Sequence, residues 1–223
     1  MPLPNGTLKS RAEWQLAFVA AKAARLPLHR GDEKNWDHLA AVSAILGETT
    51  PSARVLDAGA EFYGNVLPAL FAYGYRDLYG INLSFTEGAR RGPIRYQPGD
   101  ITQTVFADNS FDAVACMSVI EHGVPLEGYF REMYRVLKPG GLLITSTDYY
   151  PTPIDTTGKT AHGAAIKVFT KAEIQEMLRL AQEIGFESTG EVDLECSERP
   201  VRWEQFDLDY SFVIFTLRKP MAR

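Results

Sequence analysis

Apolar segments of strand length alternate with amphipathic helical patterns from residue 53 onward. Seven such segments are rich in β-branched and aromatic residues and are bounded by glycine, proline or charged residues, a pattern typical of strands. They are residues 53–59, 76–83, 93–97, 111–119, 141–147, 186–194 and 210–217.

Helical periodicity precedes these segments and fills several of the intervals between them. Ser10 and Glu13 have the spacing of a capping box, and the apolar residues that follow predict a first helix. Thr170 and Glu173 repeat that spacing before a helix that is expected to end at Gly185. Further helices are predicted over residues 32–46, 66–73 and 127–137.

Strands that alternate with helices predict an α/β fold, in which a mostly parallel sheet carries helices on both faces. We expect a doubly wound, seven-stranded sheet with one antiparallel edge strand, because no helix is predicted between the last two strand segments. Residues 1–50 are expected to form an N-terminal helical cap and residues 51–223 the main domain. The Gly/Thr/Pro-rich stretch 151–168 is long for a plain connection, which favours a lid loop.

Composition narrows the classes of partner. The chain has 223 residues and a net charge of −5, which gives no general attraction to nucleic acid. No stretch has the length and apolarity of a membrane span, and the first residues lack the apolar core of a secretory signal. We therefore expect a cytoplasmic protein without membrane insertion. The two cysteines and four histidines lack the spacing of metal ligands, so no metal site is predicted.

Polar residues and glycines stand where the predicted strands end, which is where ligands bind in sheets of this kind. Asp57 closes the first of these strands, and Gly59 permits a tight turn whose free N–H groups favour a polar or anionic ligand group. An ordinary strand-to-helix turn explains the same residues. A dinucleotide-binding loop needs glycine at position 61, where the chain has Glu61 followed by Phe62 and Tyr63. A nicotinamide-dependent oxidoreductase is therefore disfavoured.

The ends of the later strands extend this pattern. One strand ends in GINLS (80–84), the next leads into Gly99-Asp100-Ile101, and another ends at Met117-Ser118 before Glu121-His122. The segment that follows is FDAVACMSVIEHGVPLEGYFREMYRVLKPGGLLITSTDYY (111–150). Together these residues resemble the class I methyltransferases that depend on S-adenosyl-L-methionine. The resemblance, which covers about Ala53 to Tyr149, implies a Rossmann-like fold and that cofactor.

The resemblance also implies a role for each strand end. The cofactor-binding residues expected from it are Asp57, Gly59, Ala60, Tyr63, Asn82, Leu83, Asp100, Ile101, Met117 and Ser118. The family usually has an acidic residue at the position of Asn82, where it binds both ribose hydroxyls, and an amide can still donate and accept without the charge. Asp100 would accept from the adenine amino group, although an Asx turn explains it equally well. The bulky residues 62 and 63 imply an altered loop, with an aromatic ring beside the methionine chain or the sulfonium.

Candidate chemistry follows the strand ends at 119 and 147. His122 is expected near the transferred methyl group and has the side chain of a general base, but it equally well binds the cofactor or caps a turn. Glu121 beside it is a candidate to orient the imidazole. Tyr149, Tyr150 and His162 are candidates to contact the acceptor; the tyrosines are as readily wall or core, and His162 is as readily a surface residue.

The expected function is transfer of a methyl group to an oxygen, or a nitrogen, of a small-molecule acceptor such as a sugar, a glycan or a secondary metabolite. The alternative is a cofactor-binding or regulatory domain of the same fold that has lost catalysis. The changes at residues 61–63 and at Asn82 motivate that alternative.

Overall fold

The computed structural model describes residues 2–221 and has the expected α/β, Rossmann-like architecture. The helices are α1 (Arg11–Ala23), α2 (Asn35–Glu48), α3 (Val66–Ala72), α4 (Leu126–Val136) and α5 (Lys171–Ile184), with 3-10 turns η1 (Asp32–Lys34) and η2 (Glu204–Phe206). The strands are β1 (Gly6–Thr7), β2 (Arg54–Ala58), β3 (Asp77–Asn82), β4 (Ala89–Arg91), β5 (Ile94–Pro98), β6 (Phe111–Met117), β7 (Leu137–Tyr149), β8 (Thr160–Ala161), β9 (Ala164–Ala165), β10 (Glu187–Ser188), β11 (Val201–Trp203) and β12 (Leu208–Arg218).

The main sheet has the order β1-β12-β7-β6-β2-β3-β5-β4, and β10 and β11 also pair with β12. Strands β7, β6, β2, β3 and β5 are parallel to one another, whereas β12, β1 and β4 run antiparallel to their neighbours. The predicted count of seven strands with one antiparallel edge strand was wrong, because the sheet has ten strands. The additional strands have only two or three residues, too few to produce an apolar alternation in the sequence.

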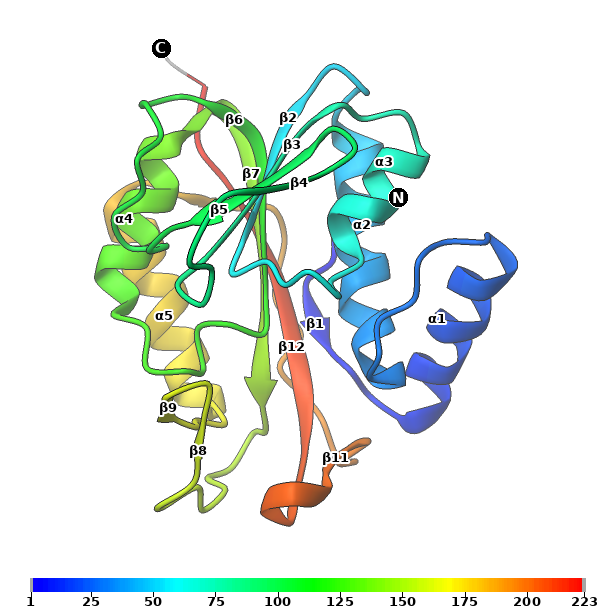
Figure 1. Cartoon of the computed structure of the whole chain (residues 1–223). Coiled ribbons are helices and arrows are strands. Elements are labelled where there is room, and N and C mark those ends of the chain that lie inside the picture. The colour runs from blue at the N-terminus through cyan, green and yellow to red at the C-terminus, as the bar shows by residue number, and fades with distance from the viewer. Residues whose placement is uncertain (1, 222–223) are drawn as a thin grey trace.

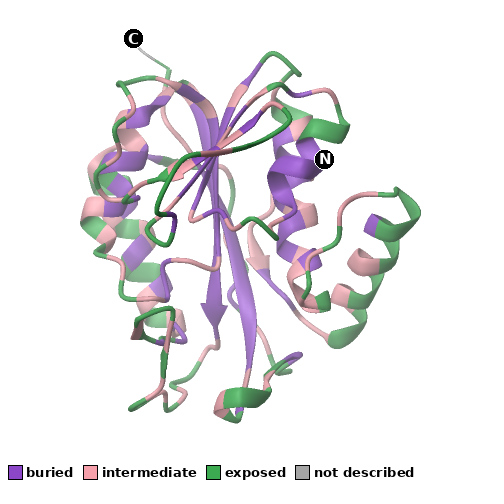
Figure 2. Cartoon of the chain, in the orientation of Figure 1, coloured by how far each residue is buried: buried purple, intermediate pink, exposed green. Residues whose placement is uncertain are grey.

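Helices cover both faces of this sheet, as Figure 1 shows, with α4 and α5 on one face and α2 and α3 on the other. The central strands β2, β6, β7 and β12 of the sheet between them are mostly buried (Figure 2). Thr170 and Glu173 form the predicted capping box at the start of α5. Helix α2 packs Ala41 and Ile45 into the same core as β2 and α3, so this helix of the predicted cap shares a core with the main domain.

Parallel strands place their carboxyl ends at one edge of the sheet, at the lower side of Figure 1. β2 is the first strand of the parallel set, and the chain continues on one side through β3 and β5 and on the other through β6 and β7. The order of strands therefore switches direction beside β2, which is where such sheets form a ligand crevice. Among the helices of residues 2–221, none combines the length and the apolarity needed to cross a membrane.

Candidate functional site

A cavity of about 910 Å³ opens at the carboxyl ends of β2, β3 and β6. This volume is in the range of small-molecule binding sites. The structure brings thirteen of the sequence-predicted site residues to its wall. They are Asp57, Gly59, Ala60, Tyr63, Asn82, Leu83, Asp100, Ile101, Met117, Ser118, Glu121, His122 and His162. Residues from four strand ends thus face a shared space, although their roles in it stay predictions.

Gly59 makes the turn after β2 possible. Its φ is +97°, and a Cβ added there would lie 2.3 Å from Val119 Cγ2, so a side chain is excluded on both grounds. The Gly59 N–H donates to the Ile81 carbonyl at 2.8 Å, which ties the loop to β3. Asp57 lies just before this turn and is buried, and burial together with the nearby charge of Glu61 raises its pKa to about 7.

The two aromatic residues of this loop pack in different places. Phe62 stacks against Phe85 and Tyr96, with ring centroids 4.6 and 5.0 Å apart, and it does not line the cavity. Phe62 and Tyr63 are alternatives for an aromatic ring beside the cofactor, and that placement stays a prediction. Tyr63 lines the cavity and packs edge-on against His29 at 5.5 Å. These outward contacts explain how a loop with bulky residues is accommodated.

Asn82, at the end of β3, holds the same loop. Its Nδ2 donates to the carbonyls of Gly59 at 3.2 Å and Ala60 at 3.0 Å, and it also meets Glu61 Oε1 at 3.4 Å. Its Oδ1 accepts from the Ser84 N–H at 2.8 Å. The opposite amide orientation would place Oδ1 against two carbonyl oxygens, so these contacts fix the orientation. The amide donors are therefore engaged by the protein itself.

Asp100 forms the Asx turn that was one of its two predicted roles. Its Oδ1 accepts from the Thr102 N–H at 2.8 Å and from the Thr102 hydroxyl at 2.7 Å. The side chain is nevertheless exposed on the cavity wall. The turn therefore holds the carboxylate in place without removing it from the cavity, and adenine binding by Asp100 stays a prediction.

Lys34 is a cavity residue that sequence reasoning missed, since it lies in a charged segment with the composition of a surface turn. Its Nζ donates to the Ser118 hydroxyl at 2.6 Å and lies 3.7 Å from Asp148 Oδ1. Ser118 adopts a left-handed backbone, with φ of +53°, at the end of β6. Asp148 Oδ1 is buried on the cavity wall and has no hydrogen-bond partner within residues 2–221.

The carboxyl groups around Lys34 resist ionisation. Burial raises the pKa of Asp148, and the positive charge of Lys34 opposes that rise. Burial and the charge of Asp148 also raise the pKa of Glu121, whose Oε2 accepts from the Thr147 hydroxyl at 2.9 Å. Glu121 is therefore bound to β7, and no hydrogen bond joins it to His122 within the described chain.

His122 lies on the cavity wall with its Nδ1 buried and free of hydrogen bonds to described residues. Its ring packs edge-on against His162 with centroids 5.0 Å apart. Burial lowers the pKa of His122 to about 4, and the charges of His162 and Lys34 add to that effect. The imidazole is thus neutral at physiological pH and has a nitrogen available to accept a proton.

Tyr149 and Tyr150 are not among the residues that line this cavity, and their contact with an acceptor stays a prediction. Tyr149 is fully buried and donates from its hydroxyl to the Leu194 carbonyl at 2.5 Å. Tyr150 donates to the Ser197 carbonyl at 3.4 Å, and its ring lies beneath the Arg199 guanidinium. The alternation of β7 turns Asp148, rather than Tyr149, toward the cavity.

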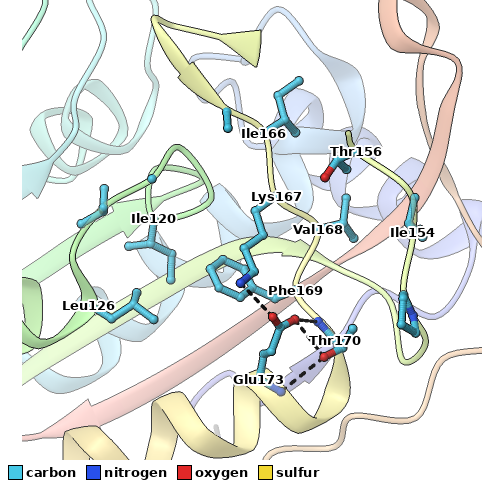
Figure 3. Close-up of a pocket in the computed structure, with 14 residues that line it drawn as sticks. Ile120, Leu126, Ile154, Thr156, Ile166, Lys167, Val168, Phe169, Thr170 and Glu173 are labelled. Atoms are coloured by element: carbon cyan, nitrogen blue, oxygen red, sulfur yellow. Dashed lines mark hydrogen bonds and ion pairs between the residues drawn. The ribbon is translucent and has the colours of Figure 1, made fainter. Parts of the chain in front are cut away.

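A second hollow of about 740 Å³ adjoins the cavity and shares Gly123 and Val124 with it. Figure 3 shows its wall, which is formed largely by apolar side chains from the loop after β6 and from the segment 151–168. The apolar residues are Ile120, Val124, Leu126, Ile154, Ile166, Val168 and Phe169. Glu173, at its edge, pairs with Lys167 at 2.8 Å.

Residues 56–145 match the protein family described as a methyltransferase domain, and they include the ends of β2, β3 and β6. By sequence, this part of the chain is similar to methyltransferase domains. The sterol 24-C-methyltransferase of Yarrowia lipolytica is 30% identical to it over 171 residues, which are 69% of this chain and 44% of that protein. The chain spans less than half the length of the curated relatives it matches.

Two solved structures share the fold of this chain. An S-adenosylmethionine-dependent methyltransferase from Mesorhizobium loti superposes with a TM-score of 0.59 at 21% identity, covering 83% of this chain and 97% of that one. The [4+2]-cyclase SpnF superposes with a TM-score of 0.58 at 18% identity, covering 98% of this chain and all of that one (100%). At these identities the likeness shows the fold alone.

The cavity fits S-adenosylmethionine, the cofactor of this family. The carboxyl groups of Asp57 and Glu61 line it, and such groups attract a cationic ligand. The exposed Leu83 presents an apolar surface beside the end of β3. The residues that would hold the cofactor are those predicted at the ends of β2, β3, β5 and β6.

Proposed function

We propose that this protein transfers the methyl group of S-adenosylmethionine to an oxygen, or a nitrogen, of a small-molecule acceptor. The observation that supports this most is that the ends of β2, β3 and β6 share one cavity with His122 and Asp148. S-adenosylmethionine supplies, when bound, an electrophilic methyl group on a sulfonium. The protein's own task is to orient the acceptor and to exclude water.

His122 is the proposed general base. Its neutral imidazole lines the cavity and has a free nitrogen, so it can take the proton that a hydroxyl or ammonium acceptor must lose. A base whose pKa is about 4 provides little driving force, so we expect proton transfer to accompany methyl transfer rather than precede it. Asp148, with an unpartnered oxygen nearby on the wall, is proposed to accept a hydrogen bond from the acceptor.

The second hollow supports an acceptor that has an apolar part. It continues from the cavity past Gly123 and Val124 and offers an apolar wall of a size that would hold several rings or a short chain. The segment 151–168 is proposed to act as a lid, because it forms one wall of this hollow and also brings His162 to the cavity. The curated relatives are named as sterol methyltransferases that modify carbon, which makes a sterol-like acceptor a further candidate.

The test is a mass-spectrometric screen of acceptors in the presence of S-adenosylmethionine. The panel holds hydroxylated and amine-bearing metabolites, simple sugars, and sterols, each with and without an apolar part. The expected result is a gain of one methyl group on an amphipathic hydroxyl or amine compound. If only a carbon of a sterol is methylated, the protein acts as the names of its relatives indicate. His122 would then not be the base that deprotonates an oxygen or nitrogen acceptor.

A second candidate is a domain that binds the cofactor without methylating anything. The altered loop at residues 61–63 favours it. The fold does not require methyl transfer, because one structure with this fold is named as a cyclase. This candidate would be supported if S-adenosylmethionine binds saturably, no acceptor gains a methyl group, and the protein does not hydrolyse the cofactor.

A further inference from the structure

Glu61 stands where the usual sequence pattern of a cofactor loop has no side chain. Of the three bulky residues in this loop, Phe62 packs on Phe85 and Tyr96, and Tyr63 packs on His29. The Glu61 carboxylate lies beside Asn82, and the residue lines the cavity. A turn in which the Gly64 N–H donates to the Glu61 carbonyl at 2.9 Å holds the backbone on either side.

Asn82 cannot both hold the loop and bind a diol with its amide. Its two N–H groups are directed at the carbonyls of Gly59 and Ala60 and at Glu61, and Oδ1 accepts from Ser84. A donor already shared among three oxygens has little left for a ligand hydroxyl. The Glu61 carboxylate, which lies beside the end of β3, has acceptor capacity and carries the negative charge that Asn82 lacks.

We propose that Glu61, reaching over from the loop after β2, is the carboxylate that binds the ribose hydroxyls of the cofactor, and that Asn82 positions it. This inference rests on the proposed use of S-adenosylmethionine. The carboxylate lies at the end of β3, between the end of β2, where Asp57 lies, and the end of β5, where Asp100 lies. The ribose of the cofactor lies between its methionine part and its adenine. A cofactor that extends from Asp57 to Asp100 would therefore place the ribose hydroxyls at the end of β3, beside Glu61.

A hydroxyl that donates to a carboxylate forms a charge-assisted hydrogen bond, and two neighbouring hydroxyls can use both carboxylate oxygens. The carboxylate of Glu61 has one oxygen near Asn82 Nδ2 and is only half-buried, so it keeps its capacity to accept. In this proposal Glu61, twenty-one positions earlier in the chain, supplies the carboxylate that position 82 lacks. An alignment by position would not identify Glu61, because it does not stand at the position of the usual acidic residue.

The test is isothermal titration calorimetry with S-adenosylhomocysteine, its 2′-deoxy analogue and 5′-methylthioadenosine, which lacks the amino acid part. Glu61→Gln should weaken S-adenosylhomocysteine and 5′-methylthioadenosine by similar factors, about tenfold to hundredfold. The 2′-deoxy analogue should bind both proteins with nearly the same affinity. Glu33→Gln is the matched control, because Glu33 lines the same cavity from η1 and loses the same charge.

The outcomes separate this inference from the proposed function. If the wild type binds S-adenosylhomocysteine and Glu61→Gln binds it with the same affinity, the role of Glu61 is overturned and the proposed function is not. A loss confined to S-adenosylhomocysteine, with 5′-methylthioadenosine unaffected, would place Glu61 at the ammonium group and also overturn it. Absence of any heat with the wild-type protein would overturn both proposals.

Asn82→Asp provides an independent measurement. The change restores the acidic residue that the family usually has, but it sets a carboxylate against the carbonyls of Gly59 and Ala60 and against Glu61. We therefore expect weaker binding of S-adenosylhomocysteine than in the wild type, and partial recovery when Glu61→Gln is added. Tighter binding by Asn82→Asp would contradict the proposal, because it would show that a carboxylate at position 82 serves the ribose better.

Discussion

Asp57 is a buried carboxyl group whose ionisation the folded protein resists. Only 7% of its surface is exposed, and burial together with Glu61 raises its pKa to about 7 from an ordinary value of 3.8. Because the pKa is higher in the folded state, folding favours the protonated form. Stability is therefore lost as the pH rises from about 4 through 7, by at most roughly 4 kcal/mol when ionisation is complete.

Asp57→Asn, which stays neutral, should remove this pH dependence. Its free energy of unfolding relative to the wild type should be greater at pH 8 than at pH 4, by up to about 4 kcal/mol. Urea denaturation at the two pH values measures this difference. Asp100→Asn serves as the control, since its exposed side chain loses little hydration on folding. Equal relative stability of Asp57→Asn at both pH values would contradict the account.

His122 gives a prediction about rate. Once an acceptor with a hydroxyl is known, His122→Gln should lower kcat by about 10²- to 10⁴-fold, because the general base is lost. The dissociation constant for S-adenosylhomocysteine should change little. The wild-type kcat/KM should fall only as the pH drops toward about 4, since burial lowers the pKa of His122 to that value. Unchanged turnover in the variant would dismiss the proposed base.

Lys34 joins three elements that lie far apart in the sequence. It belongs to η1, donates to Ser118 after β6 and pairs with Asp148 on β7. Burial favours the neutral amine, but the charges of Asp148 and Asp37 outweigh that effect and raise the pKa of Lys34. The cation therefore stays charged and balances carboxylates that have little access to water.

Lys34→Met should destabilise the protein by about 3 kcal/mol at pH 7, because it leaves Asp148 without a counter-charge. Adding Asp148→Asn should recover much of that loss, as expected when the cost is an unpaired buried charge. Lys9→Met is the control, since Lys9 forms a more exposed pair with Asp193 and should cost less than about 1 kcal/mol. Chemical denaturation measures the wild type, Lys34→Met, Asp148→Asn, their double variant and Lys9→Met, and additive effects of the two cavity changes would contradict the pairing.

The elements themselves show how far local pattern determines structure. Thr170 and Glu173 predict a helix start that the structure confirms, because a capping box needs only neighbouring residues. The strand predicted over 186–194 retains only β10, since its apolar residues are interrupted by Gly190 and exposed Glu187. The short strand β1 forms through pairing with β12, which lies near the other end of the chain, so local sequence cannot predict it.

The candidate site divides in the same way. Asp57, Asn82 and Met117 could be predicted to meet because parallel strands end at one edge of a sheet. Lys34 and Tyr210 reach the cavity through η1 and β12, which the sequence places far from those strands. No local signal distinguishes these two residues from an ordinary surface lysine or core tyrosine, so only the packed chain brings them to the site.

One hydrophobic cluster of the molecule extends across the predicted division at residue 50. Helix α2 buries Ala41, Val42 and Ile45 against the sheet, and β1 pairs with β12. A chain that begins at residue 51 would expose one apolar face of the sheet. We expect it to lack a cooperative thermal transition by circular dichroism, whereas a native-like transition would show that residues 1–50 are a separate cap.

The central claim is that consecutive strand ends form one binding site for a nucleoside-bearing sulfonium. Titration calorimetry of the wild-type protein with S-adenosylmethionine tests it most directly. The account predicts a single saturable site with a micromolar dissociation constant, and a marked loss of affinity in Asp100→Ala. Heat that fails to saturate at millimolar cofactor, or an affinity that Asp100→Ala leaves intact, would contradict it.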